Sequence, residues 1–493
     1  MMQSASNSRL LGGWSRFPLT ALAAAIIVAT TAVGAVHIGD RYRIDTASGA
    51  RVALARYFDE GTLYPPLYDG EKYGGTRFMP LPLVLHGVAA KITGEYLTSG
   101  KALAYAAMFG VLALTLLLLR KHKCPWPLAI ALTAIVLATE SGMKGTMSLR
   151  ADSLALLLQL GAISMVVGRQ TATRDSLAAL LAAGAFIAEL SAIWALLAIV
   201  VHLWLLDRRR SARFLMIYVI AAAGVFGVAA IASEGRIVTN VLGLAGAGIQ
   251  GPSSLVVAPY RFLTLLIQEA LAAVVLLPLA VVAIIRELRA GRPSVTSWSL
   301  VFCTIGIAFV LTDIGTGWNQ LVDFVVLEVL VVGVLAGIIP DSERTLSYTI
   351  VAATLGAGVL GGATVVVPAS RDALSTVRDP SLWSAHPLPG DGIVLSEDPY
   401  VPVSMGQDPV VLDPFMLLRI GNDDPGAVED LVRRIEAREF DLVVLTTSLE
   451  PPDQDWWRNY HFGTAVTEAM ARAYSPVGRT QGYWLYEPTV GGG

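Results

Sequence analysis

Cysteine and charged residues are both scarce in this chain. Only two cysteines occur in 493 residues, Cys124 and Cys303, so no disulfide framework is predicted. Charged residues make up 15% of the sequence, well below the roughly 25% of an ordinary soluble domain. This low share excludes a soluble globular protein. The formal net charge of -3 gives no indication of a nucleic-acid partner, and none is predicted.

Hydrophobic residues make up 54% of the sequence and gather in long runs. A run needs about 20 apolar residues to cross a bilayer, and it must be helical because lipid offers no partner for backbone groups. The fold class is therefore mainly α, a polytopic transmembrane helix bundle. We expect about eleven spans, over residues 18–37, 102–120, 126–140, 152–168, 177–189, 191–206, 213–232, 261–285, 297–314, 321–339 and 348–367.

Basic clusters predict the orientation of these spans. Arg120–Lys123 and Arg208–Arg210 fall on the same side as the N-terminus, which the positive-inside rule makes cytoplasmic. We therefore expect a multi-pass protein of the bacterial cytoplasmic (inner) membrane. With eleven spans, the polar first loop (38–80) and everything after residue 367 are extracytoplasmic. Residues 1–367 form the transmembrane module, and residues 368–493 form a separate domain.

The C-terminal region changes from long apolar runs to short ones. Strands are predicted over 393–395, 410–412, 441–446 and 482–486, and a helix over 427–438. This alternation is typical of a small soluble α/β domain. Its residues show no spacing typical of a nucleotide-binding loop or a metal cluster.

One further apolar stretch, residues 80–92, is too short to cross the bilayer. We expect a helix lying in the membrane interface, with Pro80 at its start and Gly94 at its end.

The first loop carries carboxylates close to the first span. Asp45, with Asp40 in reserve, is a candidate general base, because a low dielectric nearby raises the pKa of a carboxyl group. The alternative is that Asp45 caps a helix beginning near Thr46. Further along, Asp59, Glu60 and Tyr64 suit recognition of sugar hydroxyls, or an ordinary proline-rich loop.

Cations on the expected outer face are candidates for binding phosphate. Arg150 and Lys144 can hold an anionic lipid phosphate, with Asp152 orienting Arg150; alternatively, Asp152 only stabilises a helix N-terminus. Arg77 can hold a phosphate or extend to the interface. Asn319 belongs to a third polar cluster, and Glu328, within an apolar run, is interpreted as structural.

Several short motifs resemble one known class. They are Tyr64-Pro65-Pro66, R-A-D-S-L-A-L at 150–156, G-T-G-W-N at 315–319, S-E-D-P at 396–399 and D-P-F at 413–415. The chain resembles the GT-C class of membrane glycosyltransferases, in particular the bacterial family similar to protein O-mannosyltransferases and aminoarabinose transferases.

The resemblance implies an inverting transfer outside the membrane from a polyprenyl-phosphate sugar to a glycan, lipid or protein acceptor. It implies a first-loop aspartate as base, here Asp45 or Asp40, although the Asp-Glu pair common in the class occurs here only as Asp59-Glu60. It places the donor phosphate on Arg150, Lys144 and Arg77. No cofactor is predicted beyond the lipid-linked donor, and the need for a divalent metal stays open.

Two alternatives belong to other functional classes. A transporter or flippase would use Arg150, Asp152, Asp313 and Glu328 as an ion path, but no clear internal repeat supports it. A non-catalytic scaffold would bind an envelope partner through its outer domain.

Overall fold

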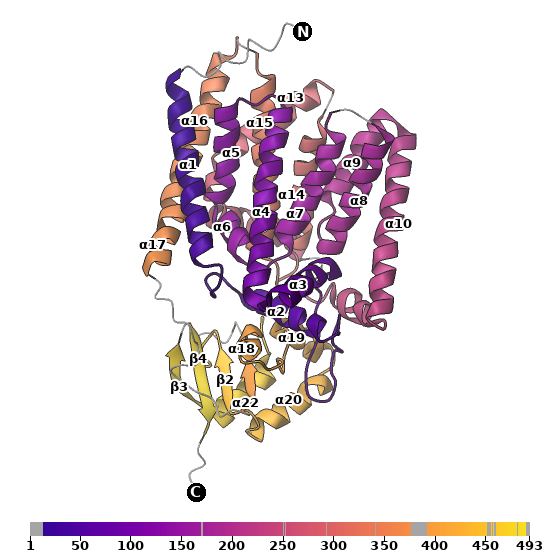
Figure 1. The fold of residues 1–493 in the computed structure, drawn as a ribbon, viewed down its shortest axis with the longest axis vertical. Coiled ribbons are helices and arrows are strands. Elements are labelled where there is room, and N and C mark those ends of the chain that lie inside the picture. The colour runs from indigo at the N-terminus through magenta and orange to yellow at the C-terminus, as the bar shows by residue number, and fades with distance from the viewer. Residues whose placement is uncertain are drawn as a thin grey trace.

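A bundle of long helices is followed by a small mixed domain, and loops with two shorter helices lie between them (Figure 1). The computed structural model describes residues 13–168, 171–249, 251, 253–291, 293–340, 342–375, 392–450, 455, 457, 460–480 and 482–489. Helix α1 starts at the end of the bundle farthest from the small domain, and α17 ends close to that domain (Figure 1).

Helices occupy every range in which a span is expected, which confirms the mainly helical class. The bundle contains α1 (Gly13–Val36), α4 (Tyr96–Lys121), α5 (Trp126–Leu137), α6 (Glu140–Met147), α7 (Asp152–Val166), α8 (Ala172–Ala188), α9 (Trp194–Leu206), α10 (Arg208–Ala232), η2 (Val238–Leu242), α11 (Ser254–Glu269), α12 (Leu271–Val274), α13 (Leu277–Arg289), α14 (Val295–Val310), η3 (Trp318–Gln320), α15 (Leu321–Ile338), α16 (Arg344–Gly361), η4 (Gly362–Val366) and α17 (Val367–Ser375).

The expected single helix over 261–285 is wrong. Ala270 adopts φ -143° and ψ 41°, which interrupts the helical hydrogen bonds and divides this range among α11, α12 and α13. Within the described residues, five helices are long and apolar enough to cross a membrane, and a sixth span results if α5 and α6, bent by 74°, are taken together. The total of eleven spans stays a prediction.

Helix α15 is the most deeply placed of the long helices. Within residues Trp318–Ile338, 83% of the most apolar 18-residue stretch is buried inside the protein. It packs against α5, α13 and α14 in the main hydrophobic core. Trp318 and Asn319 belong to η3, and α15 follows η3 directly. The buried helix α15 therefore fixes the position of both residues.

Two shorter helices follow the first span and lie at the mouth of the bundle (Figure 1). Helix α2 (Thr46–Asp59) is capped by Asp45, the residue before it. Helix α3 (Pro80–Thr93) has proline at its first turn, and Gly94 follows it in the left-handed conformation, φ 76°. The predicted helix over 80–92 is therefore confirmed. The two helices pack closely, because a Cβ at Gly87 of α3 would collide with the Phe58 ring of α2.

The small domain contains one four-stranded sheet of order β1-β2-β4-β3. Strand β1 (Val394–Ser396) pairs in parallel with β2 (Leu442–Leu445), and β4 (Tyr483–Pro488) pairs antiparallel with β2 and with β3 (Tyr474–Thr480). The accompanying helices are α18 (Tyr400–Ser404), α19 (Pro414–Asp423), α20 (Gly426–Glu436) and α22 (Thr464–Ala473). Three of the four predicted strands are confirmed.

The predicted strand over 410–412 is wrong. Val411 forms only an isolated parallel bridge with Tyr73 of the first loop, so its buried apolar side chains reflect docking between the two regions. A second contact joins the same two parts. Arg41 Nη2 lies 3.1 Å from Asp398 Oδ2, and its guanidinium stacks 4.0 Å from the Tyr483 ring centre. The small domain therefore holds the first loop at both of its ends.

Candidate active site

Asp45 meets Arg150 at the start of α2. One carboxylate oxygen, Oδ1, caps the helix by accepting hydrogen bonds from the backbone N and hydroxyl of Ser48, at 2.8 and 2.7 Å. The other, Oδ2, accepts from Nε and Nη2 of Arg150, at 3.0 and 2.6 Å. Burial acts to raise the pKa of Asp45, but the charge of Arg150 and these hydrogen bonds outweigh it and hold the pKa below its usual value.

Arg150 lies just before α7, between two partners. Its guanidinium lies 5.2 Å from the Trp318 ring centre, which is a cation–π contact. Its Nε and Nη2 are held by the Asp45 carboxylate. Asp152, the first residue of α7, does not contact Arg150 directly; its Oδ1 accepts a 2.8 Å hydrogen bond from Asn319 Nδ2. The structure thus brings Asp45, Arg150, Asp152 and Asn319 together from three distant parts of the chain.

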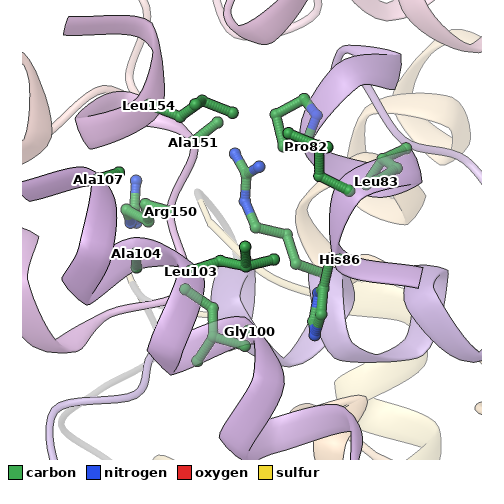
Figure 2. A pocket seen from close by; sticks show the side chains of 13 residues that line it. Pro82, Leu83, His86, Gly100, Leu103, Ala104, Ala107, Arg150, Ala151 and Leu154 are labelled. Atoms are coloured by element: carbon green, nitrogen blue, oxygen red, sulfur yellow. The ribbon is translucent and has the colours of Figure 1, made fainter. Parts of the chain in front are cut away.

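An apolar pocket opens beside this cluster. It has a volume of about 520 Å³ including its mouth, and it lies between α3, α4 and the start of α7. Pro82, Leu83 and His86 face Leu103 and Ala104 across it, with Arg150 at one side (Figure 2). The polar side chains of its lining belong to Arg150, Arg51 and His86.

Arg51 belongs to α2 and is only 6% exposed. It stacks on Phe78, 4.1 Å from the ring centre, and its Nη2 lies 3.9 Å from Glu189. Its Nε and Nη1 find no hydrogen-bond partner among the described residues. A buried guanidinium with unused donors is costly unless an anion binds it, so the side chain of Arg51 is suited to an anion at the pocket wall.

Glu189 is the first residue after α8, in the short turn before α9. Burial and the nearby charge of Asp152 raise the pKa of Glu189 to about 7, against the opposing charges of Arg51, Arg150 and Arg77. Sequence reasoning missed both Arg51 and Glu189. Arg51 lies on a face of α2 shared with apolar residues, and Glu189 lies between two apolar runs; neither pattern shows that the two side chains meet.

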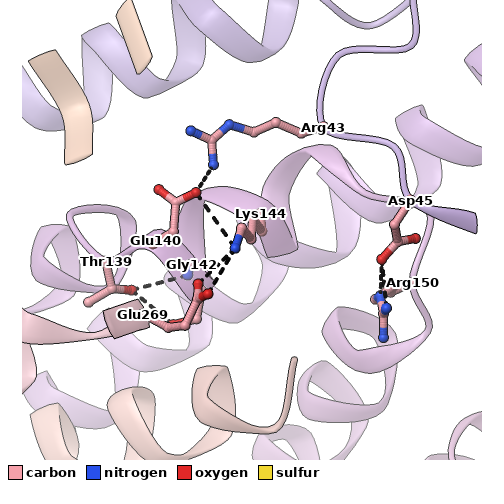
Figure 3. Close-up of polar contacts among 9 residues, drawn as sticks. Arg43, Asp45, Thr139, Glu140, Gly142, Lys144, Arg150 and Glu269 are labelled. Atoms are coloured by element: carbon pink, nitrogen blue, oxygen red, sulfur yellow. Dashed lines mark hydrogen bonds and ion pairs between the residues drawn. The ribbon is translucent and has the colours of Figure 1, made fainter. Parts of the chain in front are cut away.

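Lys144 contacts the same Trp318 ring as Arg150, with its Nζ 5.6 Å from the ring centre, and lies among carboxylates. Its Nζ is 2.9 Å from Glu269 Oε2 and 3.8 Å from Glu140, which also pairs with Arg43 (Figure 3). Asp45 and Arg150 form a second pair beside this group (Figure 3). Two carboxylates therefore already pair with Lys144, and its binding of a lipid phosphate stays a prediction.

The remaining predicted residues are placed elsewhere. Arg77 pairs with Asp313. Asp40 accepts from the backbone N of Tyr42 and contacts His37, so it anchors the turn before α2. Asp59 accepts a 2.9 Å hydrogen bond from Tyr96.

Distance separates Asp59 and Glu60 from Arg150. They end the 14-residue helix that Asp45 begins, and that length corresponds to about 20 Å. Tyr64 is fully buried and donates to the Phe78 carbonyl. Its predicted contact with sugar is therefore corrected to a packing role, because no part of its ring reaches solvent. Among the described residues, no three His, Cys, Asp or Glu side chains are grouped to hold a metal ion.

Solved structures provide the comparison with known proteins. No family model matches the sequence, and no curated protein does. ArnT from Cupriavidus metallidurans, crystallised with undecaprenyl phosphate, is similar with a TM-score of 0.57 and 11% identity, over 93% of this chain and 97% of that one.

Two archaeal structures are similar as well. The apo oligosaccharyltransferase of Archaeoglobus fulgidus has a TM-score of 0.54 and 11% identity, over 92% of this chain and 73% of that one. AglB from the same organism, in complex with an inhibitory peptide and a dolichol-phosphate, has a TM-score of 0.53 and 9% identity, over 92% and 72%. The predicted GT-C-like fold is confirmed.

Proposed function

We propose, from the GT-C-like fold and the arginine-lined pocket, that this protein is a membrane glycosyltransferase. It moves a hexosyl or pentosyl group, with inversion, from a polyprenyl-phosphate donor to a hydroxyl of an extracytoplasmic glycan, lipid or protein. The observation that carries the proposal is the apolar pocket whose wall holds Arg51, a buried cation with two unused donors.

The pocket matches both halves of such a donor. Its apolar wall of α3, α4 and α7 side chains suits the isoprenoid next to the phosphate, and its two arginines suit the phosphate itself. ArnT was crystallised with undecaprenyl phosphate and AglB with a dolichol-phosphate. These ligands are carriers of the same chemical class, on the same fold, which supports this choice of donor.

The reaction needs fixed positive charge where the leaving group develops its own charge. When the bond from the sugar to the phosphate breaks, the phosphate leaves as an anion, and preorganised cations stabilise that charge in the transition state. Arg150 is held rigidly by Asp45 and Trp318, so it loses little freedom on binding. Lys144 and Arg77 are already paired, and their contacts to the donor stay predictions.

The acceptor hydroxyl also needs a carboxylate that takes its proton. Asp45 as this base, with Asp40 in reserve, stays a prediction from the sequence. Asp152 and Asn319 lie beside Arg150 and are proposed to contact the donor sugar or acceptor. The site faces the outer domain, in line with the proposed extracytoplasmic side of the cytoplasmic membrane.

A binding and turnover assay tests the proposal. The protein in nanodiscs receives a panel of decaprenyl-phosphate hexoses and pentoses, with an envelope extract as acceptor source, and released decaprenyl phosphate is measured. We expect Arg51→Gln to weaken decaprenyl-phosphate binding about 10- to 100-fold, the value of one or two charge-assisted hydrogen bonds. The matched control, Lys91→Gln, removes an exposed cation of α3 and is expected to change nothing.

Each outcome has a clear meaning. Release of decaprenyl phosphate with transfer of its sugar supports the glycosyltransferase. Movement of the carrier across the bilayer without release supports the transporter or flippase alternative. Unchanged carrier binding by Arg51→Gln contradicts the pocket assignment.

A further inference from the structure

Three carboxylates surround the two arginines of the pocket, and they differ in how many hydrogen bonds they accept. Both oxygens of Asp45 accept two hydrogen bonds each, from Ser48 and Arg150. A carboxylate offers about four such positions, so Asp45 has none left for an acceptor hydroxyl unless it releases Arg150 or the cap of α2. Asp152 accepts one hydrogen bond, on Oδ1, from Asn319 Nδ2.

Glu189 is different. Its side chain is 27% exposed, and its nearest cation, Arg51 Nη2, is 3.9 Å away, beyond hydrogen-bond distance. Among the described residues nothing donates a hydrogen bond to its carboxylate. Its neighbours Ala188 and Ala192 pack with Leu154, which lines the pocket. Glu189 therefore lies behind the pocket wall, next to Arg51, with its oxygens available.

We propose that Glu189 is the general base of the transfer, and that Asp45 is a positioning residue that aims Arg150 at the donor phosphate. This inference rests on the proposed function. The acceptor oxygen forms a bond to the anomeric carbon while the bond from that carbon to the phosphate oxygen breaks. The hydroxyl proton goes to Glu189, and the electron pair leaves with the phosphate, which Arg51 and Arg150 hold.

The electrostatic surroundings of Glu189 support this role. Asp152 of α7 and Asp323 of α15 face it as carboxylates, and Arg51, Arg150 and Arg77 face it as cations. Burial and the charge of Asp152 outweigh the charges of the arginines and raise the pKa of Glu189 to about 7. A general base with a pKa in this range works best at neutral pH. The pKa of Asp45 is instead lowered.

The pH dependence therefore distinguishes the two carboxylates. A base must be ionised, so with Glu189 as base the turnover rate falls as the pH drops through about 7. With Asp45 as base, the rate stays constant down to about pH 5, because Asp45 remains ionised there. Asp398, whose pKa is raised to about 6, also titrates in this range. Asp398→Asn is the control that removes its contribution.

The experiment measures release of decaprenyl phosphate and binding of decaprenyl phosphate in nanodiscs. We expect Glu189→Gln to lower kcat about 100-fold or more, to keep carrier binding within about twofold, and to abolish the fall in rate near neutral pH. Glu189→Asp recovers part of the rate. Asp45→Asn is expected to weaken carrier binding instead, with a smaller loss of kcat. Glu95→Gln removes an exposed carboxylate just before α4 and serves as control.

Two results overturn the inference while leaving the proposed function intact: full turnover by Glu189→Gln, or a wild-type rate that is constant from about pH 5 to 8. If Glu189→Gln does not reach the membrane, Glu189→Asp decides instead, and full turnover with an unchanged pH profile in that variant overturns the inference. A wild-type protein that turns over no donor of the panel removes the proposed function, and this inference with it.

Discussion

At the scale of single residues, Asp45 combines two roles that substitutions can separate. Asparagine caps helices as well as aspartate does, whereas alanine does not. We expect Asp45→Ala to lower the free energy of unfolding about 1 kcal/mol more than Asp45→Asn, because only alanine loses the cap. Both variants release Arg150 and should weaken carrier binding equally. Denaturant unfolding in detergent checks this prediction, and equal stability of the two variants would contradict the capping role.

The ion pair of Asp45 also has a defined pH range. The pKa of Asp45 is lower in the folded protein than in the unfolded chain, where it is about 4. Its contribution to stability is therefore present at neutral pH and is lost only as the pH falls through the folded value. Loss of this contribution between pH 6 and 8, measured as the difference between wild type and Asp45→Asn, would contradict the assignment.

Single residues also show where sequence reasoning stops. The cap at Asp45 was among the predicted alternatives, because an aspartate before a helical pattern is a local signal. The pairing of Asp45 with Arg150 joins residues 105 positions apart, and the meeting of Arg51 with Glu189 depends on how α2 packs near the end of α8. No local pattern encodes either contact. Arg51 and Glu189 could therefore not be predicted.

At the scale of elements, the contact of α2 with α3 forms one wall of the pocket. A methyl group at Gly87 would collide with Phe58, whereas one at Gly224 of α10 meets no atom within 4 Å. We expect Gly87→Ala to cost about 1–3 kcal/mol through overpacking, and to weaken carrier binding by moving Pro82, Leu83 and His86. Gly224→Ala should be neutral or stabilise by up to about 1 kcal/mol.

Thermal unfolding and decaprenyl-phosphate binding check both glycine variants. Equal behaviour of Gly87→Ala and Gly224→Ala would show that the spacing of α2 and α3 does not shape the pocket.

Elements with strong local signals were predicted well. Long apolar runs predicted the helices α1, α4, α10 and α15, and Pro80 and Gly94 predicted the two ends of α3. Strand β3 (Tyr474–Thr480) was missed, because its side chains are mostly exposed and it contains a proline. Residues 410–412 were predicted as a strand because they are apolar, but their burial comes from contact with the first loop. The pattern of apolar residues indicates that a segment is buried. It does not indicate which other segment packs against it.

At the scale of the whole molecule, the small C-terminal domain supports the first loop. Asp398 lies against Arg41, and Tyr483 donates a hydrogen bond to it. A Cβ at Gly49, four residues after Asp45, would collide with the Asp398 carboxylate. The small domain therefore fixes the start of α2 and, through Asp45, the direction of Arg150.

This support is expected to weaken with rising pH. Burial raises the pKa of Asp398 to about 6 although Arg41 opposes the shift, so its contribution to stability is full below the unfolded pKa and is lost as the pH rises through about 6. Between about pH 5 and 7 the loss is on the order of 1 kcal/mol. Asp398→Asn should remove this part of the pH dependence of thermal unfolding. An unchanged pH dependence in Asp398→Asn would contradict this account.

The most direct test of the central claim is a structure of the protein in nanodiscs with bound decaprenyl phosphate. We expect a phosphate within hydrogen-bond distance of Arg51 Nε and Nη1 and near Arg150, with the isoprenoid chain between α3 and α4. A phosphate bound away from both arginines, with the pocket empty, would contradict it.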